Sequence, residues 1–244
     1  MEAIAPQPAD RFIEIGPGPG ALTTRLAPRV QQLTAFEVDR DLAARLQPQL
    51  PRTADVVVTD FLSVDLAPFV AAVPVRIAGN LPYNISSPIL FRLLEASRQH
   101  GGLIDATIML QLEVADRLVA APGTKDYGVL TVLTALGADV MRVLTLPPGA
   151  FRPMPKVRSA VVRLTFRPPR VVIADRPLLE RLVRSVFTLR RKTMLNALRP
   201  FAGSLGRDPA SALSAAAIDP GRRPETLTLE EFGRLADVLS SAYP

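Results

Sequence analysis

Cysteine and tryptophan are absent from this 244-residue chain, and His100 is its single histidine. Without cysteine there is no disulfide framework and no thiolate metal site, and a single histidine excludes a zinc centre of the Cys/His kind. We therefore expect no metal, and the lack of disulfides fits a cytoplasmic protein. The segment Arg98-Gln99-His100-Gly101 is typical of the end of a helix, so His100 is not a candidate catalytic group.

Long apolar runs are also missing. No stretch approaches the roughly 20 apolar residues that span a bilayer, and residues 1–10 lack the basic and apolar regions of a signal peptide. Hydrophobic residues nevertheless make up 48% of the chain, which is enough for a substantial core. We expect a globular monomer of one or two domains with no membrane partner.

Acidic residues are scarce in one third of the chain. Between Arg142 and Arg199 there are 14 Lys/Arg and 2 Asp/Glu, so this stretch carries +12 while the whole chain carries only +6. The rest of the chain is therefore net acidic. Such a concentration of positive charge is expected of a surface that faces a polyanion, although a solvated basic face is the simpler alternative.

Short apolar runs alternate with amphipathic stretches over the first two thirds of the chain. This alternation predicts a mostly parallel sheet with helices on both faces, which is a doubly wound, Rossmann-like α/β fold. Two later strands, Val140–Leu144 and Ala160–Phe166, are joined by a loop too rich in proline for a helix, so we expect an antiparallel hairpin at the sheet edge. Pro168-Pro169 then separates an α/β domain (residues 1–168) from a small helical domain (residues 169–244). The expected elements are strands at Phe12–Ile15, Leu33–Phe36, Val56–Thr59, Val75–Ala78 and Thr107–Leu110, and helices at Ala21–Ala27, Arg40–Gln47, Pro88–Gln99, Pro177–Phe187, Lys192–Leu198, Pro209–Ala217 and Leu229–Ala242.

Three polar features follow the first three strands. Gly16 and Gly18 open a glycine-rich turn into the first helix, where a ligand can lie against bare backbone. Glu37 ends the second strand and can accept hydrogen bonds from both hydroxyls of a ribose, and Asp60 ends the third and can accept one from an adenine amino group. The pattern suits a nucleoside cofactor, NAD or S-adenosylmethionine alike. The structural alternatives are a solvated pair of Glu37 with Arg40 and a helix cap by Asp60.

The segment Asn80-Leu81-Pro82-Tyr83 follows the fourth strand and separates these two cofactors. The exocyclic amine of adenine is a poor nucleophile, and the methyl group of S-adenosylmethionine is already activated, so an enzyme must mainly orient the amine. The Asn80 side-chain oxygen and a backbone carbonyl of the loop can accept the two amine hydrogens. Pro82 stiffens the loop, and Tyr83 offers a ring face for a flipped base. The spacing matches the (Asn/Asp)-Pro-Pro-Tyr type motif of amino methyltransferases, with Leu81 at its second position.

A second aromatic side chain precedes a rigid basic loop, residues 151–159. Phe151 can close the other face of the adenine, while Lys156 and Arg158 meet phosphate. The alternative is that Phe151 fills the interface between the two domains.

These motifs together resemble a known family, the KsgA-type ribosomal RNA small-subunit adenine N6,N6-dimethyltransferases, over essentially the whole chain. The matching segments are residues 14–18, 36–40, 79–86, 127–128, 151–159, 190–193, 218–220 and 223–225. The resemblance implies a class I methyltransferase fold that binds S-adenosylmethionine through the residues at Gly16, Glu37, Asp60 and Asn80. It also implies dimethylation of two adjacent adenines in a hairpin loop near the 3′ end of small-subunit (16S) rRNA, within the immature 30S subunit. The basic run Arg190-Arg191-Lys192 favours this substrate over large-subunit rRNA.

One departure from the family concerns its N-terminus. Family members carry a Phe-x-Gln-Asn-Phe-Leu motif ahead of the first strand, and there it wraps the methionine end of the cofactor. No such motif occurs in this sequence. The resemblance therefore predicts that the loop Asn80-Leu81-Pro82-Tyr83, which binds the adenine, is complete. It also predicts that the segment that covers the methionine end of the cofactor is missing. An alternative function is that of a ribosome-assembly factor, which binds immature small subunits with little or no methylation.

Overall fold

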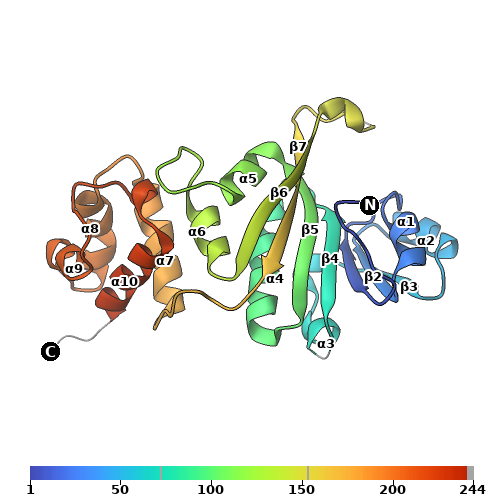
Figure 1. Ribbon diagram of the computed structural model, residues 1–244, viewed down its shortest axis with the longest axis horizontal. Coiled ribbons are helices and arrows are strands. Elements are labelled where there is room, and N and C mark those ends of the chain that lie inside the picture. The colour runs from blue at the N-terminus through green and yellow to red at the C-terminus, as the bar shows by residue number, and fades with distance from the viewer. Residues whose placement is uncertain (72, 153, 241–244) are drawn as a thin grey trace. The chain divides into compact units, whose positions relative to one another are not determined.

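The computed structural model describes residues 1–71, 73–152 and 154–240, and a seven-stranded sheet in the order β3-β2-β1-β4-β5-β7-β6 dominates it (Figure 1). β1 to β5 run parallel to one another, whereas β7 pairs antiparallel with both β5 and β6. This confirms the predicted doubly wound sheet with an antiparallel hairpin at its edge. The strands are β1 (Arg11–Ile15), β2 (Gln32–Glu37), β3 (Ala54–Val58), β4 (Val75–Asn80), β5 (Leu103–Gln111), β6 (Ala138–Leu146) and β7 (Ser159–Phe166).

The strand order reverses between β1 and β4, which lie side by side with β2 and β3 on one side and β5 on the other. The carboxyl ends of two adjacent strands diverge at such a point, and doubly wound sheets bind their ligands there. The glycine turn leaves β1 and the Asn80 loop leaves β4 at this same edge. The topology therefore brings together two motifs that are more than 60 residues apart in the sequence.

Local signals set the ends of several helices. Asp39 caps α2 because its side chain accepts hydrogen bonds from the amides of Asp41 and Leu42. Gly101 ends α4 with a φ of 71°, so His100 is the last helical residue, as predicted. The helices of the first part of the chain are α1 (Thr23–Leu26), α2 (Arg40–Leu46), α3 (Ala67–Val70), α4 (Ser86–His100), α5 (Leu112–Leu118) and α6 (Val129–Ala135), with short 3-10 turns η1 (Ala27–Arg29), η2 (Gln47–Gln49), η3 (Phe61–Ser63) and η4 (Pro148–Ala150).

The rest of the chain is helical. Its elements are α7 (Arg176–Thr188), α8 (Met194–Ser204), α9 (Pro209–Ala215), η5 (Pro224–Thr226) and α10 (Leu229–Ser240). The Thr228/Glu231 pair forms a capping box at α10, with the Thr228 amide donating to the Glu231 carboxylate at 2.8 Å. The predicted end of α8 at Leu198 was wrong: the helix runs through Pro200 to Ser204. Packing of Ala197, Phe201 and Ala202 in the helical core outweighs the one backbone hydrogen bond that a proline removes.

The chain forms two compact units: residues 1–115 with 137–168, and residues 116–136 with 169–244. The segment 116–136, placed in the first domain by the predicted boundary, belongs to the helical unit. Tyr127 explains this, because its ring is buried beside Phe187 and its hydroxyl donates to the Leu227 carbonyl at 2.8 Å. Among the residues that the structure describes, no helix is long and apolar enough to cross a membrane.

Candidate functional site

The glycine turn after β1 holds a conformation that few other residues adopt. Gly16 and Gly18 have φ values of 66° and 55°, in the left-handed region where a Cβ atom is strained. The Gly16 amide donates to the Phe36 carbonyl on β2 at 3.0 Å. A Cβ atom on Gly18 would meet nothing within 4 Å, so its backbone is open to a ligand on that side.

Glu37, at the end of β2, binds the backbone of the glycine turn. One of its carboxylate oxygens accepts from the Gly18 amide at 2.9 Å, and the other accepts from the amides of Val38 and Asp39. The predicted alternative, a solvated pair with Arg40, is not what the structure has, because the carboxylate is only 7% exposed and is bound to backbone. Each oxygen of a carboxylate has two lone pairs, and three of these four accept backbone amides, so Glu37 keeps one lone pair, on Oε2, for a ribose hydroxyl.

Asp60 begins the 3-10 turn η3 at the end of β3. Its side chain accepts a hydrogen bond from the Leu62 amide at 2.9 Å, so the alternative reading as a cap is correct. The side chain is exposed, and the cap uses only its Oδ1 atom. A cap and a ligand contact are compatible, because each uses a different lone pair of the carboxylate.

The acceptor loop, defined as residues 80–83, is held in place mainly through its backbone. The Leu81 amide donates to the Met109 carbonyl on β5 at 3.1 Å, and the Leu81 side chain is buried in the core. Asn80 is exposed at the end of β4. The Tyr83 hydroxyl shares a hydrogen bond of 3.1 Å with the buried Ser159 hydroxyl at the start of β7, which fixes the direction of the ring. Leu81 thus anchors the loop, while Asn80 is left available to a substrate.

A cavity of about 470 Å³ in the first unit connects the glycine turn with Asn80, whereas Glu37, Asp60 and Tyr83 are not among its lining residues. The turn from Gly16 to Pro19, Asn80 and Phe151 line it, and so does Glu14 on β1. A Cβ atom on Gly16 would lie 3.9 Å from the Asn80 carbonyl oxygen, so the glycine turn and the acceptor loop are direct neighbours. Phe151, which follows η4, is half-buried and lines this cavity.

A buried carboxyl group stands in the wall of the cavity. Glu14 is 2% exposed, and its Oε2 atom has no hydrogen-bond partner among the described residues. Burial raises the pKa of Glu14 to about 7, and the Thr23 hydroxyl nearby offsets part of this rise. The Thr23 Oγ1 atom itself reaches no hydrogen-bond partner in the described part of the chain. Glu14 therefore changes protonation near neutral pH.

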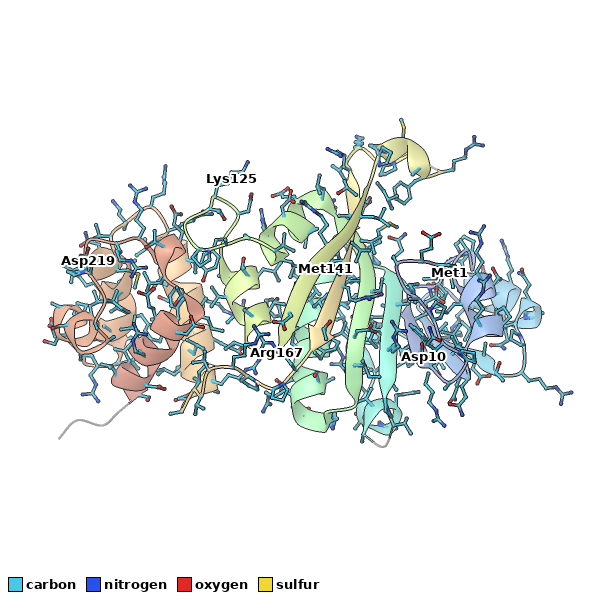
Figure 2. The ribbon with its side chains drawn as sticks, viewed as in Figure 1. Met1, Asp10, Lys125, Met141, Arg167 and Asp219 are labelled. Atoms are coloured by element: carbon cyan, nitrogen blue, oxygen red, sulfur yellow. The ribbon has the colours of Figure 1, made fainter. Side chains whose placement is uncertain are left out.

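The N-terminal turn also lines the cavity, and two arginines hold it in place. Arg76 on β4 donates to the carbonyls of Ile4 and Ala5 as well as to Asp10 and Asp105. Arg163 on β7 donates to the Ala3 carbonyl. Met1 and Ala3 line the cavity as a result, and Met1 lies nearer than Asp10 to the end of the sheet where the β6–β7 loop projects (Figure 2).

The predicted RNA-binding residues differ in their surroundings. Lys156 and Arg158 in the first unit, and Arg191 and Lys192 in the second, are exposed. Arg190 is engaged within the second unit, where its guanidinium pairs with Glu225 at 2.5 Å and donates to the Thr124 carbonyl. Arg190 therefore stabilises the helical unit. Of the five predicted RNA-binding residues, the four exposed ones are available to phosphate.

Several residues of the site carried only weak signals in the sequence. Glu14 is a carboxylate inside an apolar strand, two residues before Gly16. That position could have identified it as a candidate site residue. Arg76 is likewise a charge inside an apolar strand. Ser159 had no such signal, because its role depends on β7 lying beside the acceptor loop. Within residues 1–71, 73–152 and 154–240, no three His, Cys, Asp or Glu side chains gather in a group that could hold a metal ion.

Comparison with known proteins gives concordant matches. Residues 1–240 match the family described as "Ribosomal RNA adenine dimethylase". The protein called "Ribosomal RNA small subunit methyltransferase A" from Syntrophotalea carbinolica is 46% identical over 239 residues, which cover 97% of this chain and 89% of that protein. The crystal structure of 23S rRNA methyltransferase ErmE is 30% identical with a TM-score of 0.71, covering 98% of this chain and 95% of that one. A dimethyladenosine transferase from Plasmodium falciparum shares the fold, with a TM-score of 0.77 at 22% identity over 96% of this chain and 91% of that one.

Proposed function

The chain belongs to the ribosomal RNA adenine dimethylase family, and we propose that it dimethylates N6 of two adjacent adenines in a 3′-terminal hairpin loop of small-subunit rRNA. S-adenosylmethionine is the methyl donor in this proposal, and the immature 30S subunit is the particle that presents the loop. The modification would then be a step in ribosome biogenesis.

The position of the acceptor loop carries the proposal. Asn80 leaves β4 beside Gly16, and both line one cavity that extends to Phe151. The glycine turn for the cofactor, the amine-binding Asn80 and the stacking ring of Phe151 therefore line the same cavity. It lies at the point where the strand order of the sheet reverses. The 46% identity to a protein named for the small subunit, against 30% to one named for 23S rRNA, favours the small subunit as substrate.

The residues present fit S-adenosylmethionine. The backbone around Gly18 is open, Glu37 keeps one acceptor lone pair for a ribose hydroxyl, and the exposed Asp60 can accept from an adenine amine. The cavity volume lies within the usual range for a nucleoside-sized ligand. When bound, this cofactor supplies an electrophilic methyl group on a sulfonium sulfur.

The remaining chemistry is orientation of the acceptor. The Asn80 side-chain oxygen and a carbonyl of the acceptor loop accept the two hydrogens of N6, which directs the nitrogen lone pair toward the cofactor side of the cavity. Tyr83, held by Ser159, and Phe151 provide faces against which the adenine stacks. N6 gains a methyl group at each transfer, and the positively charged nitrogen that results is acidic enough to give its proton to water, so no strong base is needed. Unpaired loop bases suit this site because splaying them out costs little.

Transfer to isolated ribosomal particles tests the proposal. Small subunits purified without the modification, incubated with the protein and methyl-labelled S-adenosylmethionine, should take up label on two adjacent adenines, located by primer extension. Label on large subunits would favour the 23S substrate. Binding to small subunits without any transfer would favour an assembly factor instead, and either result would overturn the proposal.

RNA affinity should depend strongly on salt. We assign phosphate contacts to Lys156, Arg158, Arg191 and Lys192, and place most of the subunit contacts on the helical unit, residues 116–136 and 169–244. Replacing Arg191 and Lys192 by glutamine should weaken binding to a small-subunit rRNA fragment. It should also reduce the slope of log affinity against log salt by roughly 1 to 2, because up to two phosphate contacts are lost. Filter binding across a salt series measures both quantities. An unchanged slope would place the phosphate contacts elsewhere.

A further inference from the structure

The cavity continues past Asn80 on the side away from the glycine turn, and its lining there is apolar. We infer that Met109 and Val161 hold the first methyl group on N6 while the second is added, so that these two side chains determine dimethylation rather than monomethylation of each adenine. This inference rests on the proposed function. It gives a task to the part of the cavity that lies beyond the acceptor loop.

Strand register places four side chains of the cavity in one row. Asn80 on β4 pairs with Met109 on β5. Met109 in turn pairs with Val161 on β7, and Val161 pairs with Leu144 on β6. Paired residues of neighbouring strands point to the same face of a sheet, and the strands lie about 4.8 Å apart. Because all four residues line the cavity, the row leads directly from the amine-binding Asn80 to three apolar side chains.

The other side of Asn80 faces the glycine turn. β4 has β1 on one side and β5 on the other, and a Cβ atom on Gly16 would lie 3.9 Å from the Asn80 carbonyl oxygen. In the proposed site the new methyl group arrives from the glycine turn. A methyl group that N6 already carries must therefore lie away from that turn, on the side where β5 places Met109.

The first transfer changes what N6 requires from the protein. Before it, the amine donates both hydrogens, one to the Asn80 side-chain oxygen and one to a carbonyl of the acceptor loop. Afterwards a methyl group occupies one of these two places, and it cannot donate a hydrogen bond but is stabilised by apolar contact. At the Asn80 position this contact is with Met109, whose flexible thioether side chain adapts its shape to a small group. The remaining hydrogen then stays on the loop carbonyl.

The depth of the row favours its inner end as the place for the methyl group. Met109 and Val161 are partly buried, whereas Leu144 is 38% exposed. At the second transfer N6 gains the methyl carbon of the sulfonium, the C–S bond breaks with its electron pair left on sulfur, and the remaining proton of N6 passes to water. The product nitrogen carries two methyl groups and no hydrogen, which suits an apolar wall.

The two transfers can be timed separately. Small subunits without the modification are incubated with excess protein and labelled S-adenosylmethionine, and chromatography of the digested RNA gives N6-monomethyl- and N6,N6-dimethyladenosine over time. Met109→Phe fills the space beside Asn80, and Val161→Thr keeps the shape of the side chain but adds a hydroxyl group. Met141→Phe is the matched control, because Met141 lies on the same face of the sheet through its pairing with Arg163 but does not line the cavity. Circular dichroism establishes that each variant is folded.

Met109→Phe should slow the second transfer by roughly 10- to 200-fold, the range that one methylene group is worth in an apolar pocket, while the first transfer stays close to normal. Val161→Thr should also slow only the second transfer, by a smaller factor, because its hydroxyl group must give up water to the methyl group. Monomethyladenosine should accumulate with these two variants, and Met141→Phe should behave like the unmodified chain.

Equal slowing of both transfers by Met109→Phe and Val161→Thr would overturn the inference, and so would normal formation of dimethyladenosine by both. If Met109→Phe does not fold, the ratio of the two rate constants in Val161→Thr decides, because that ratio does not depend on the amount of folded protein. An unmodified chain that transfers no methyl group, or only one to each adenine, would instead remove the proposed function itself.

Discussion

Replacing Asn80 by alanine should lower the rate of methyl transfer by at least about 100-fold, while RNA affinity stays nearly unchanged. In the proposed mechanism the side-chain oxygen accepts a hydrogen from N6, and the variant has nothing to replace it. The fold should survive, because Asn80 is exposed and the loop is anchored by the Leu81 amide on Met109. Single-turnover transfer at saturating cofactor and RNA measures the chemical step separately from binding.

Two variants make this result specific. Asn80→Asp keeps an acceptor oxygen at the same place, so it should retain more activity than Asn80→Ala. Asn84→Ala removes an exposed asparagine four residues further along the same segment and should leave the rate close to normal. An Asn80→Ala protein that transfers methyl groups at the normal rate would refute the role given to this side chain.

Replacing Arg76 by methionine should destabilise the first unit by about 3–5 kcal/mol. The side chain is buried, and its loss leaves the carboxylate of Asp10 without its cation and that of Asp105 with only the more distant Arg163, 3.9 Å away. Burial alone would lower the pKa of Arg76, but these two carboxylates outweigh it and raise that pKa. The guanidinium also lies 5.0 Å from the centre of the Phe12 ring, a further contact that methionine cannot reproduce fully. Urea unfolding followed by circular dichroism measures the free energy of unfolding.

The N-terminal turn should loosen in the same variant. The Ile4 and Ala5 carbonyls lose their donors, so hydrogen exchange in residues 1–10 should accelerate. Arg98→Met is the matched control, because the Arg98–Glu95 pair is a surface pair expected to contribute less than about 1 kcal/mol. The prediction is wrong if Arg76→Met costs no more than this control.

Much of the fold follows from local patterns. Short apolar runs with glycine or acidic residues after them predict parallel strands and the edge at which ligands bind, and the proline-rich loop predicts the edge hairpin. Local reasoning was wrong about α8, where a proline lies inside the helix, and about residues 116–136. In both cases burial against distant residues, such as Tyr127 against Phe187 and Leu227, decided the outcome.

The candidate site also contains residues that the sequence predicted and features that only the structure revealed. Asn80, Glu37 and Gly16 stand out because the chemistry of adenine and ribose recognition requires particular side chains after particular strands, and a sequence shows both. The protonation of Glu14, the bond between Tyr83 and Ser159 and the engagement of Arg190 by Glu225 became visible only in three dimensions.

The sequence by itself determined the class of fold, the order of the motifs and the kind of chemistry, because each depends on residue type and short-range spacing. The tertiary structure decided which charged groups are free and which are engaged. That depends on burial and on partners far away in the chain: Arg190 is bound to Glu225, Arg76 holds the N-terminal turn, and Glu14 lines the cavity with an oxygen that has no hydrogen-bond partner among the described residues. Desolvation and pairing set the protonation and availability of a charged side chain, and both arise only when the chain is folded.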